Sequence, residues 1–274
     1  DSNNNRLEID DSVHFLLSYT SGDSKLKEKI YSVAQSIEVE DTKTKVNSFK
    51  ELLTLFEESK NYGSLISPSI ENVETLICEL KAKDPSGQLF LDSTHERVLK
   101  ILEQTKYLLP TYNVVVANPP YMGGKGMNNN LTAWVKEHYP NSKSDLFAVF
   151  VERILDLVVP NGNIGLMTPF TWMFLDSYAK LRSRILTEST ITSLVRPEYH
   201  AFFDSAFVPI CGFTLSRSHS PKFEGAFIDL TEFYGAEVQP IKTLEAVNNS
   251  DCGWLYRASS DDFFKLPSFP IAYW

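Results

Sequence analysis

The chain has 274 residues, of which 43% are hydrophobic and 22% are charged, a composition typical of soluble globular proteins. Its net charge of -9 excludes a protein that contacts nucleic-acid phosphates over its whole surface. Any contact with nucleic acid must therefore be a local patch. The apolar runs are too short for a bilayer span and no basic-then-apolar leader opens the chain, which predicts a cytoplasmic protein without a membrane partner. Its three cysteines share no metal-ligand spacing and leave an odd count, so free thiols are predicted and no metal site (Cys78, Cys211 and Cys252).

Residues 1–110 are predicted to be mostly helical. Apolar residues recur three and four positions apart in several stretches, as on one face of a helix. The predicted helices are Leu26 to Ile37, Lys45 to Ser59, Ile70 to Leu80 and His95 to Leu109. We interpret this region as an insert or as the remnant of a cofactor-binding half.

After Pro110 strands and helices alternate with short connections. In chain order the pattern predicts a strand at Asn113 to Ala117, a long loop over 122–144, a helix at Asp145 to Val159, a strand at Asn163 to Met167, a helix at Leu175 to Leu186, and strands at Thr190 to Val195 and Gly212 to Ser216. This order is typical of α/β proteins, in which ligands bind at the carboxyl ends of strands. The predicted fold is therefore a partial doubly wound, Rossmann-like sheet with a helical N-terminal region. Residues 111–220 form its catalytic core, and residues 221–274 are a weakly patterned C-terminal extension.

The strongest chemical signal is the sequence Asn118-Pro119-Pro120-Tyr121, directly after the first predicted strand. An exocyclic amine on an aromatic ring is a poor nucleophile because its lone pair is delocalised. Hydrogen-bond acceptors aimed at its two N–H groups can draw it out of the plane, and the Asn118 side chain and the Pro119 carbonyl can supply them. The prolines stiffen the turn, and Tyr121 can stack on a base that has left the double helix. The alternative is that the four residues are only a rigid strand exit.

These four residues resemble the catalytic motif of amino-group methyltransferases that use S-adenosylmethionine. Longer stretches resemble the PglX-like adenine-specific methyltransferases of BREX phage-defence systems: Asn118 to Met127, Ser142 to Phe147, Trp172 to Leu175, Ser177-Tyr178, Leu181-Arg182 and Phe269 to Trp274. The resemblance is specific over residues 110–220 and at the end of the chain, and upstream it is limited to Asn61 to Ile66. It implies that Asn118, Pro119 and Tyr121 bind and orient the target adenine. It also implies that Asp145, Leu146 and Phe147 lie near the adenosine side of the cofactor.

The sequence departs from this family at the glycine-rich loop that holds the methyl donor. Upstream of the motif Gly22, Gly63 and Gly87 are isolated, and none lies in a Gly-x-Gly context. A strand at Leu7 to Asp11 can end in Asp10, the acid that would bind the cofactor ribose, although a solvated terminus or a helix cap explains Asp10 equally well. We therefore expect a fragment whose cofactor half precedes Asp1 and whose target-recognition region follows Trp274.

Several other residues have competing interpretations. Scattered cations can form a local basic patch or lie singly on the surface (Lys136, Lys143, Arg182, Arg184 and Arg196). The segment Gly123 to Gly126 lacks the Ser or Thr of a nucleotide-triphosphate loop and is interpreted as a mobile loop on the DNA side. Trp172 and the Phe202-Phe203 pair are predicted to be core residues, although one phenylalanine can instead form the second face of a base pocket.

Taken together, the sequence predicts a piece of an adenine-specific DNA methyltransferase that uses S-adenosylmethionine, in phage defence or restriction-modification. Its partners would be double-stranded DNA with a flipped adenine and other proteins of the defence system, and the fragment alone is expected to be inactive. One alternative is an enzyme that methylates protein glutamine or an RNA base. Another is a non-catalytic scaffold or DNA-docking subunit of a defence complex.

Overall fold

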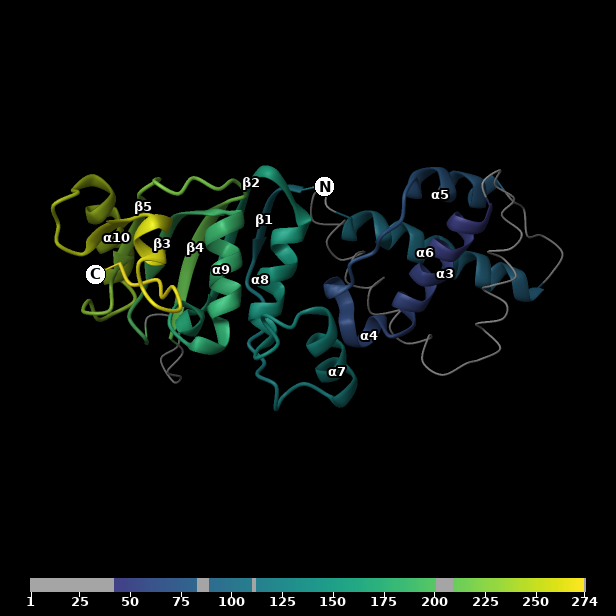
Figure 1. Cartoon of the computed structure of the whole chain (residues 1–274), viewed down its shortest axis with the longest axis horizontal. Coiled ribbons are helices and arrows are strands. Elements are labelled where there is room, and N and C mark those ends of the chain that lie inside the picture. Colours follow the sequence, from purple (N-terminus) through teal and green to yellow (C-terminus); the bar gives the residue numbers. More distant parts are fainter. Residues whose placement is uncertain (1–41, 83–88, 110–111, 201–208, 274) are drawn as a thin grey trace. The chain divides into compact units, whose positions relative to one another are not determined.

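The computed structural model describes residues 42–82, 89–109, 112–200 and 209–273 (Figure 1). The chain divides into two compact units, residues 1–109 and residues 110–274. Each unit has its own hydrophobic core. None of the helices formed by the described residues combines the length and apolar character that a membrane crossing demands.

The first unit is helical. Its elements are α3 (Thr42–Glu57), α4 (Ser59–Tyr62), the 3-10 turn η1 (Gly63–Leu65), α5 (Val73–Ala82) and α6 (Leu89–Leu108). The apolar positions of α3, including Phe49, Leu52 and Phe56, are buried against those of α5 and α6, so the periodicity correctly predicted these three helices. The predicted strand ending at Asp10 and the predicted helix from Leu26 lie outside the described residues.

The second unit is built on a six-stranded mixed sheet in the order β1-β2-β4-β3-β5-β6. Its strands are β1 (Tyr112–Ala117), β2 (Val158–Pro169), β3 (Thr190–Arg196), β4 (Ile210–Ser216), β5 (Gly225–Asp229) and β6 (Leu255–Ala258). The pairs β1–β2 and β3–β5 are parallel, whereas β4 runs antiparallel to β2 and β3, and β6 runs antiparallel to β5. The predicted α/β class with a helical N-terminal region is confirmed, and the carboxyl ends of β1, β2, β3 and β5 share one edge.

Two helices, α8 (Leu146–Leu157) and α9 (Ala179–Glu188), cover one face of this sheet (Figure 1). Side chains that alternate along the strands, such as Ile164, Leu166, Phe213 and Leu194, pack under them in a single apolar core. The 3-10 turns η2 (Phe170–Met173) and η3 (Asp176–Tyr178) connect β2 to α9. This helical layer places the beginning of α8 beside the end of β1.

Two sequence predictions need correction. The predicted loop 122–144 contains a helix, α7 (Asn129–His138), because the asparagines that suggested a loop include its N-cap: Asn128 accepts a hydrogen bond from the Leu131 backbone at 2.8 Å. The weakly patterned tail contains β5, α10 (Val238–Asn248), β6 and α11 (Ser260–Phe264). Its strands are only five and four residues long, too short for a clear period.

The C-terminal segment is part of the second unit's core. Ile271 and Tyr273 are buried, and the ring of Tyr273 stacks on Phe227 of β5 at 4.9 Å. Arg182 holds the segment by donating to the carbonyls of Ser268 and Phe269 at 2.8–3.1 Å. Residues 221–274 therefore support the sheet directly.

β1 forms one edge of the sheet and is the most exposed of the long strands. Val115 and Ala117 point toward the core, whereas Val114 and Val116 are exposed, the latter by 77%. Parallel strands are usually covered on both faces, which explains why β1 is apolar from Val114 to Ala117. The strand that carries the motif is therefore supported from one side only by the described residues.

Candidate active site

The motif begins where β1 ends, at the edge of the sheet shared by the carboxyl ends of the parallel strands. Asn118, Pro120 and Tyr121 are exposed, while Pro119 is buried. The fixed φ of the two prolines limits the conformations of this turn, and the buried Pro119 anchors it. The amide of Asn118 is thus presented to solvent from a stiff backbone.

The side chains of Asn118 and Tyr121 contact each other. The Tyr121 hydroxyl donates to Oδ1 of Asn118 at 2.9 Å and also lies 3.3 Å from the carbonyl oxygen of Met167 on β2. Burial, with a smaller contribution from Cys211, raises the pKa of Tyr121, so its hydroxyl remains a proton donor at neutral pH. An amide oxygen has two lone pairs, and Oδ1 can therefore accept from Tyr121 and from an amine at the same time.

The ring of Tyr121 is supported from the core side. It meets Phe147 of α8 edge to face, with ring centroids 6.4 Å apart and an interplanar angle of 86°. Tyr121 nevertheless remains 38% exposed. This leaves aromatic surface on which a second flat group can stack.

A shallow hollow adjoins Asn118 on the face of the sheet opposite α8 and α9. It is lined by small or apolar residues of neighbouring strands, including Val116, Gly165, Val195 and Gly212. A β-carbon added at Gly212 would meet no atom within 4 Å, so this floor is open.

The residues expected on the cofactor side lie at the start of α8. Oδ1 of Asp145 accepts from the backbone N–H of Met122 at 2.9 Å and of Phe147 at 3.2 Å, so Asp145 caps the helix and ties the end of the motif to it. Leu146 is buried and Phe147 is only 1% exposed. Their assignment to the cofactor stays a prediction, and in this structure Phe147 contacts the ring of Tyr121.

A complete site for a methyl donor is not formed by these residues. The acid predicted to bind ribose, Asp10, lies outside the described part of the chain. No Gly-x-Gly sequence precedes Asn118, and Oδ1 of Asp145 already accepts two backbone hydrogen bonds.

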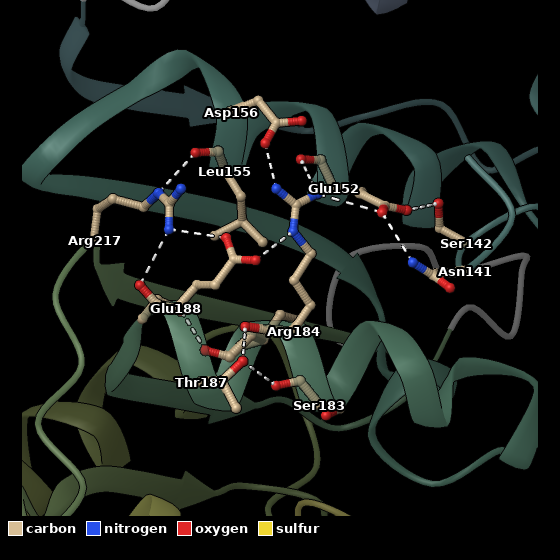
Figure 2. A network of polar contacts seen from close by, with 12 residues as sticks. Asn141, Ser142, Glu152, Leu155, Asp156, Ser183, Arg184, Thr187, Glu188 and Arg217 are labelled. Carbon is tan, nitrogen blue, oxygen red and sulfur yellow. Dashed lines mark hydrogen bonds and ion pairs between the residues drawn. The ribbon is translucent and has the colours of Figure 1, made fainter. Parts of the chain in front are cut away.

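The prediction of a basic patch is wrong for the three arginines that it included. Arg182 is fully buried and donates to four backbone carbonyls, and Arg196 pairs with Asp229 at 3.4 Å. Arg184 binds the carboxylates of Glu152, Asp156 and Glu188 between α8 and α9 (Figure 2). For Arg182 the signal was present in the sequence, because it lies on the same face of α9 as Leu181, Ile185 and Leu186.

The aromatic residues divide into predicted and missed ones. Trp172 is fully buried against Phe213, with centroids 4.9 Å apart, which confirms it as a core residue. The Phe202-Phe203 pair lies outside the described residues. Sequence reasoning missed the contact of Tyr121 with the Met167 carbonyl and with the Phe147 ring, because both partners are distant in sequence.

Comparison with known proteins places these features in a family. A family model described as Eco57I restriction-modification methylase matches residues 15–203. The adenine-specific methyltransferase PglX of Lacticaseibacillus casei (strain Zhang) is 33% identical over 236 residues, covering 83% of this chain and 20% of that protein. The adenine-specific methyltransferase BrxX of Escherichia coli O9:H4 (strain HS) is 31% identical over 227 residues, covering 81% of this chain and 18% of that protein.

The resemblance to PglX-like methyltransferases is thereby confirmed, and it extends over more of the chain than residues 110–220. The chain spans about one fifth of the length of these relatives. A likeness in shape is weaker: a modification subunit of a putative type I restriction enzyme from Vibrio vulnificus YJ016 has a TM-score of 0.45 and 11% identity, covering 68% of this chain and 48% of that chain.

Proposed function

The chain belongs to the Eco57I restriction-modification methylase family, and we propose that it carries the target-adenine side of the active site of a DNA methyltransferase. The proposed reaction transfers a methyl group from S-adenosylmethionine to the exocyclic amine of adenine. The observation that supports it most directly is the exposed Asn118 amide at the end of a parallel strand, held by Tyr121 at 2.9 Å. The adenine specificity of the PglX and BrxX relatives supports the choice of base.

In this proposal the chain's own residues act on the base and not on the donor. Oδ1 of Asn118 and the carbonyl of Pro119 accept hydrogen bonds from the two N–H groups of the amine. These bonds draw the amine out of the ring plane, so its lone pair is free for attack. Tyr121 stacks on the adenine after it has left the double helix, and Phe147 fixes the ring of Tyr121. The amine loses a proton after the attack, and no covalent bond to the protein forms.

S-adenosylmethionine supplies the electrophilic methyl group when it is bound. Asp145, Leu146 and Phe147 begin α8 beside the motif, and we assign them to the donor side on family resemblance. Asp10 is assigned to the ribose on the same basis. Double-stranded DNA is the proposed partner, together with other proteins of a defence complex, and the cytoplasm is the proposed location.

The test is the variant Asn118→Ala in the full-length protein. We expect loss of N6-methyladenine formation by about 100- to 1000-fold, since one hydrogen-bond partner of a reacting group contributes on that order. Plasmid DNA from a host that lacks adenine methylation is the substrate, and mass spectrometry of the digested nucleosides measures the product. Donor binding, followed by calorimetry, should stay close to that of the parent.

Asn113→Ala is a matched control, because Asn113 is also exposed but lies near the amino end of β1. Near-parental turnover of Asn118→Ala would show that the motif is only a rigid turn after the strand, without a catalytic role. Methylation of protein glutamine or RNA by a parent protein that leaves DNA unmodified would show that the substrate is wrong.

A further inference from the structure

The residues after the motif form a segment whose two ends meet, the insertion segment (residues 123–144). It leaves the motif after Met122 and returns at Asp145. Its two ends are joined by a bridge between Gly123 and Asp145 and by backbone hydrogen bonds from Leu146 to the Met122 carbonyl at 3.0 Å and from Gly124 to the Ser144 carbonyl at 3.3 Å. The two joined ends of the segment therefore lie beside the motif.

The insertion segment is folded and not a structureless loop. Helix α7 buries Leu131, Trp134 and Val135, and the ring of Trp134 lies 5.7 Å from that of Tyr139. These contacts give the segment a fixed shape of its own.

A buried hydrogen bond fixes the returning end of this segment. Ser142 is fully buried and donates to Glu152 of α8 at 2.6 Å, while Asn141 lies 3.5 Å from the same carboxylate (Figure 2). Arg184 of α9 in turn contacts Glu152 at 3.3 Å. The segment is thus anchored to α8, and α9 contacts the same carboxylate through Arg184.

The charge of the insertion segment is opposite to that of the whole chain. It carries Lys125, Lys136 and Lys143 against one acidic residue, Glu137, in a protein of net charge -9. All three lysines are exposed. Within the part of the chain that the structure describes, none of them has a carboxylate at ion-pair distance.

Two of these lysines lie where the two ends of the segment meet. Lys125 and Lys143 are the sequence neighbours of Gly124 and Ser144, the hydrogen-bonded residues at the neck of the segment. Like charges near one another repel, so the fold by itself provides no gain from this arrangement. An external anion would provide one.

We propose that the insertion segment binds the sugar-phosphate backbone of DNA beside the target adenine, with Lys125 and Lys143 on phosphates. This inference rests on the proposed function, because it needs DNA at the motif. Phosphate contacts position a protein on the duplex without reading its sequence. The lysines would hold the strand while Asn118 and Tyr121 act on the base.

The test measures the salt dependence of DNA binding by the full-length protein. A fluorescein-labelled duplex of arbitrary sequence is sufficient, because phosphate contacts carry no sequence information. Each phosphate contact contributes about 0.9 to the slope of log affinity against log salt. We expect the double variant Lys125→Gln/Lys143→Gln to lower this slope by about 1.8 and to weaken binding at low salt.

A matched control removes two exposed cations from the opposite edge of the sheet. Lys222 precedes β5, and Arg257 of β6 pairs with Ala226 near the beginning of β5, so both lie away from the carboxyl ends of the parallel strands. Lys222→Gln/Arg257→Gln should leave the slope unchanged. Lys125→Arg/Lys143→Arg should restore the parental slope, which separates charge from damage to the fold.

A slope of Lys125→Gln/Lys143→Gln equal to that of the parent would overturn this inference. Equal losses in the Gln variant and in the opposite-edge control would also overturn it. The measurement needs no methyl transfer, so it reports on the segment whatever the Asn118→Ala experiment shows. Conversely, loss of transfer in Asn118→Ala with an unaltered lysine slope would retain the proposed function and reject the insertion segment as a DNA contact.

Discussion

The two sides of the second unit's sheet use polar side chains in opposite ways. At the open edge, Asn118 and Tyr121 are exposed and joined by one hydrogen bond. On the covered face, Arg182 and Arg184 are surrounded by carbonyl and carboxylate oxygens between α8, α9 and the C-terminal segment. Polar groups at the edge keep hydrogen-bonding capacity for a ligand, whereas those on the covered face form hydrogen bonds and ion pairs within the fold.

That difference predicts which substitutions change stability and which change activity. The largest effect on stability is expected for Arg182→Met. It removes the donor shared by the carbonyls of Trp172, Leu175 and Ser268 and should lower the free energy of unfolding by about 3–5 kcal/mol. Urea unfolding of the 274-residue chain measures it. The exposed Arg257 gives the control, since Arg257→Met should change stability by less than about 0.5 kcal/mol.

The next effect concerns the methyl donor at the open edge. Because the described residues do not form a donor site, we expect this chain alone to bind S-adenosylmethionine at least about 100-fold more weakly than the full-length protein, or about 2.7 kcal/mol. Isothermal calorimetry on both proteins makes the comparison. Micromolar binding by the chain alone would show that the donor site is complete without further residues.

Tyr121 should separate aromatic stacking from hydrogen bonding at the same edge. Tyr121→Ala should lose about 1–3 kcal/mol of base stacking. Tyr121→Phe keeps the ring but no longer holds the Asn118 amide, and should lose about 1 kcal/mol in the transfer step. A fluorescent adenine analogue at the target position of a duplex reports base flipping by the full-length protein.

The two effects can be distinguished from general damage. Placing the target adenine opposite a mismatch should partly rescue Tyr121→Ala, because a mispaired base is easier to extrude. It should not rescue Tyr121→Phe. Equal flipping signals from the parent and Tyr121→Ala, with both folded, would make Tyr121 a packing residue.

The smallest effect is a loss of stability at alkaline pH, caused by a tyrosine that is buried on the covered face. Burial, followed by the negative charge of Asp145, raises the pKa of Tyr178 to about 12 from the ordinary value of 10.0. Between these values the unfolded chain loses the proton while the folded chain keeps it, so stability is full below pH 10 and falls as the pH rises toward 12. The contribution of Tyr178 is roughly 1–2 kcal/mol.

Chemical unfolding at pH 9.0 and at several higher values, on the order of pH 10 to 11.5, measures this loss. Tyr178→Phe should reduce it, because phenylalanine has no proton to lose. The same loss of stability in the parent and in Tyr178→Phe would contradict the assignment.

Local patterns in the sequence were sufficient for the elements near the motif. The apolar period of α8 and the β-branched run of β1 predicted both elements because each buries a continuous face against the same core. The chemistry of Asn118 and Tyr121 could be proposed from residue type and from the position of the motif after a strand. Composition misled at α7, where Asn128 is a helix cap and not part of a loop.

The sequence by itself determined the family, the α/β class and the position of the motif at a strand end, because these depend on residues close together in the chain. Only the tertiary structure decided what the charged residues do. Arg182 donates to Ser268, which is distant in sequence. A hydrogen bond between Gly124 and Ser144 likewise brings Lys125 near the second end of the insertion segment. Cations that look alike in sequence therefore divide into a buried clamp and an exposed pair, since the surroundings of each charge decide whether it binds the fold or remains available to a ligand.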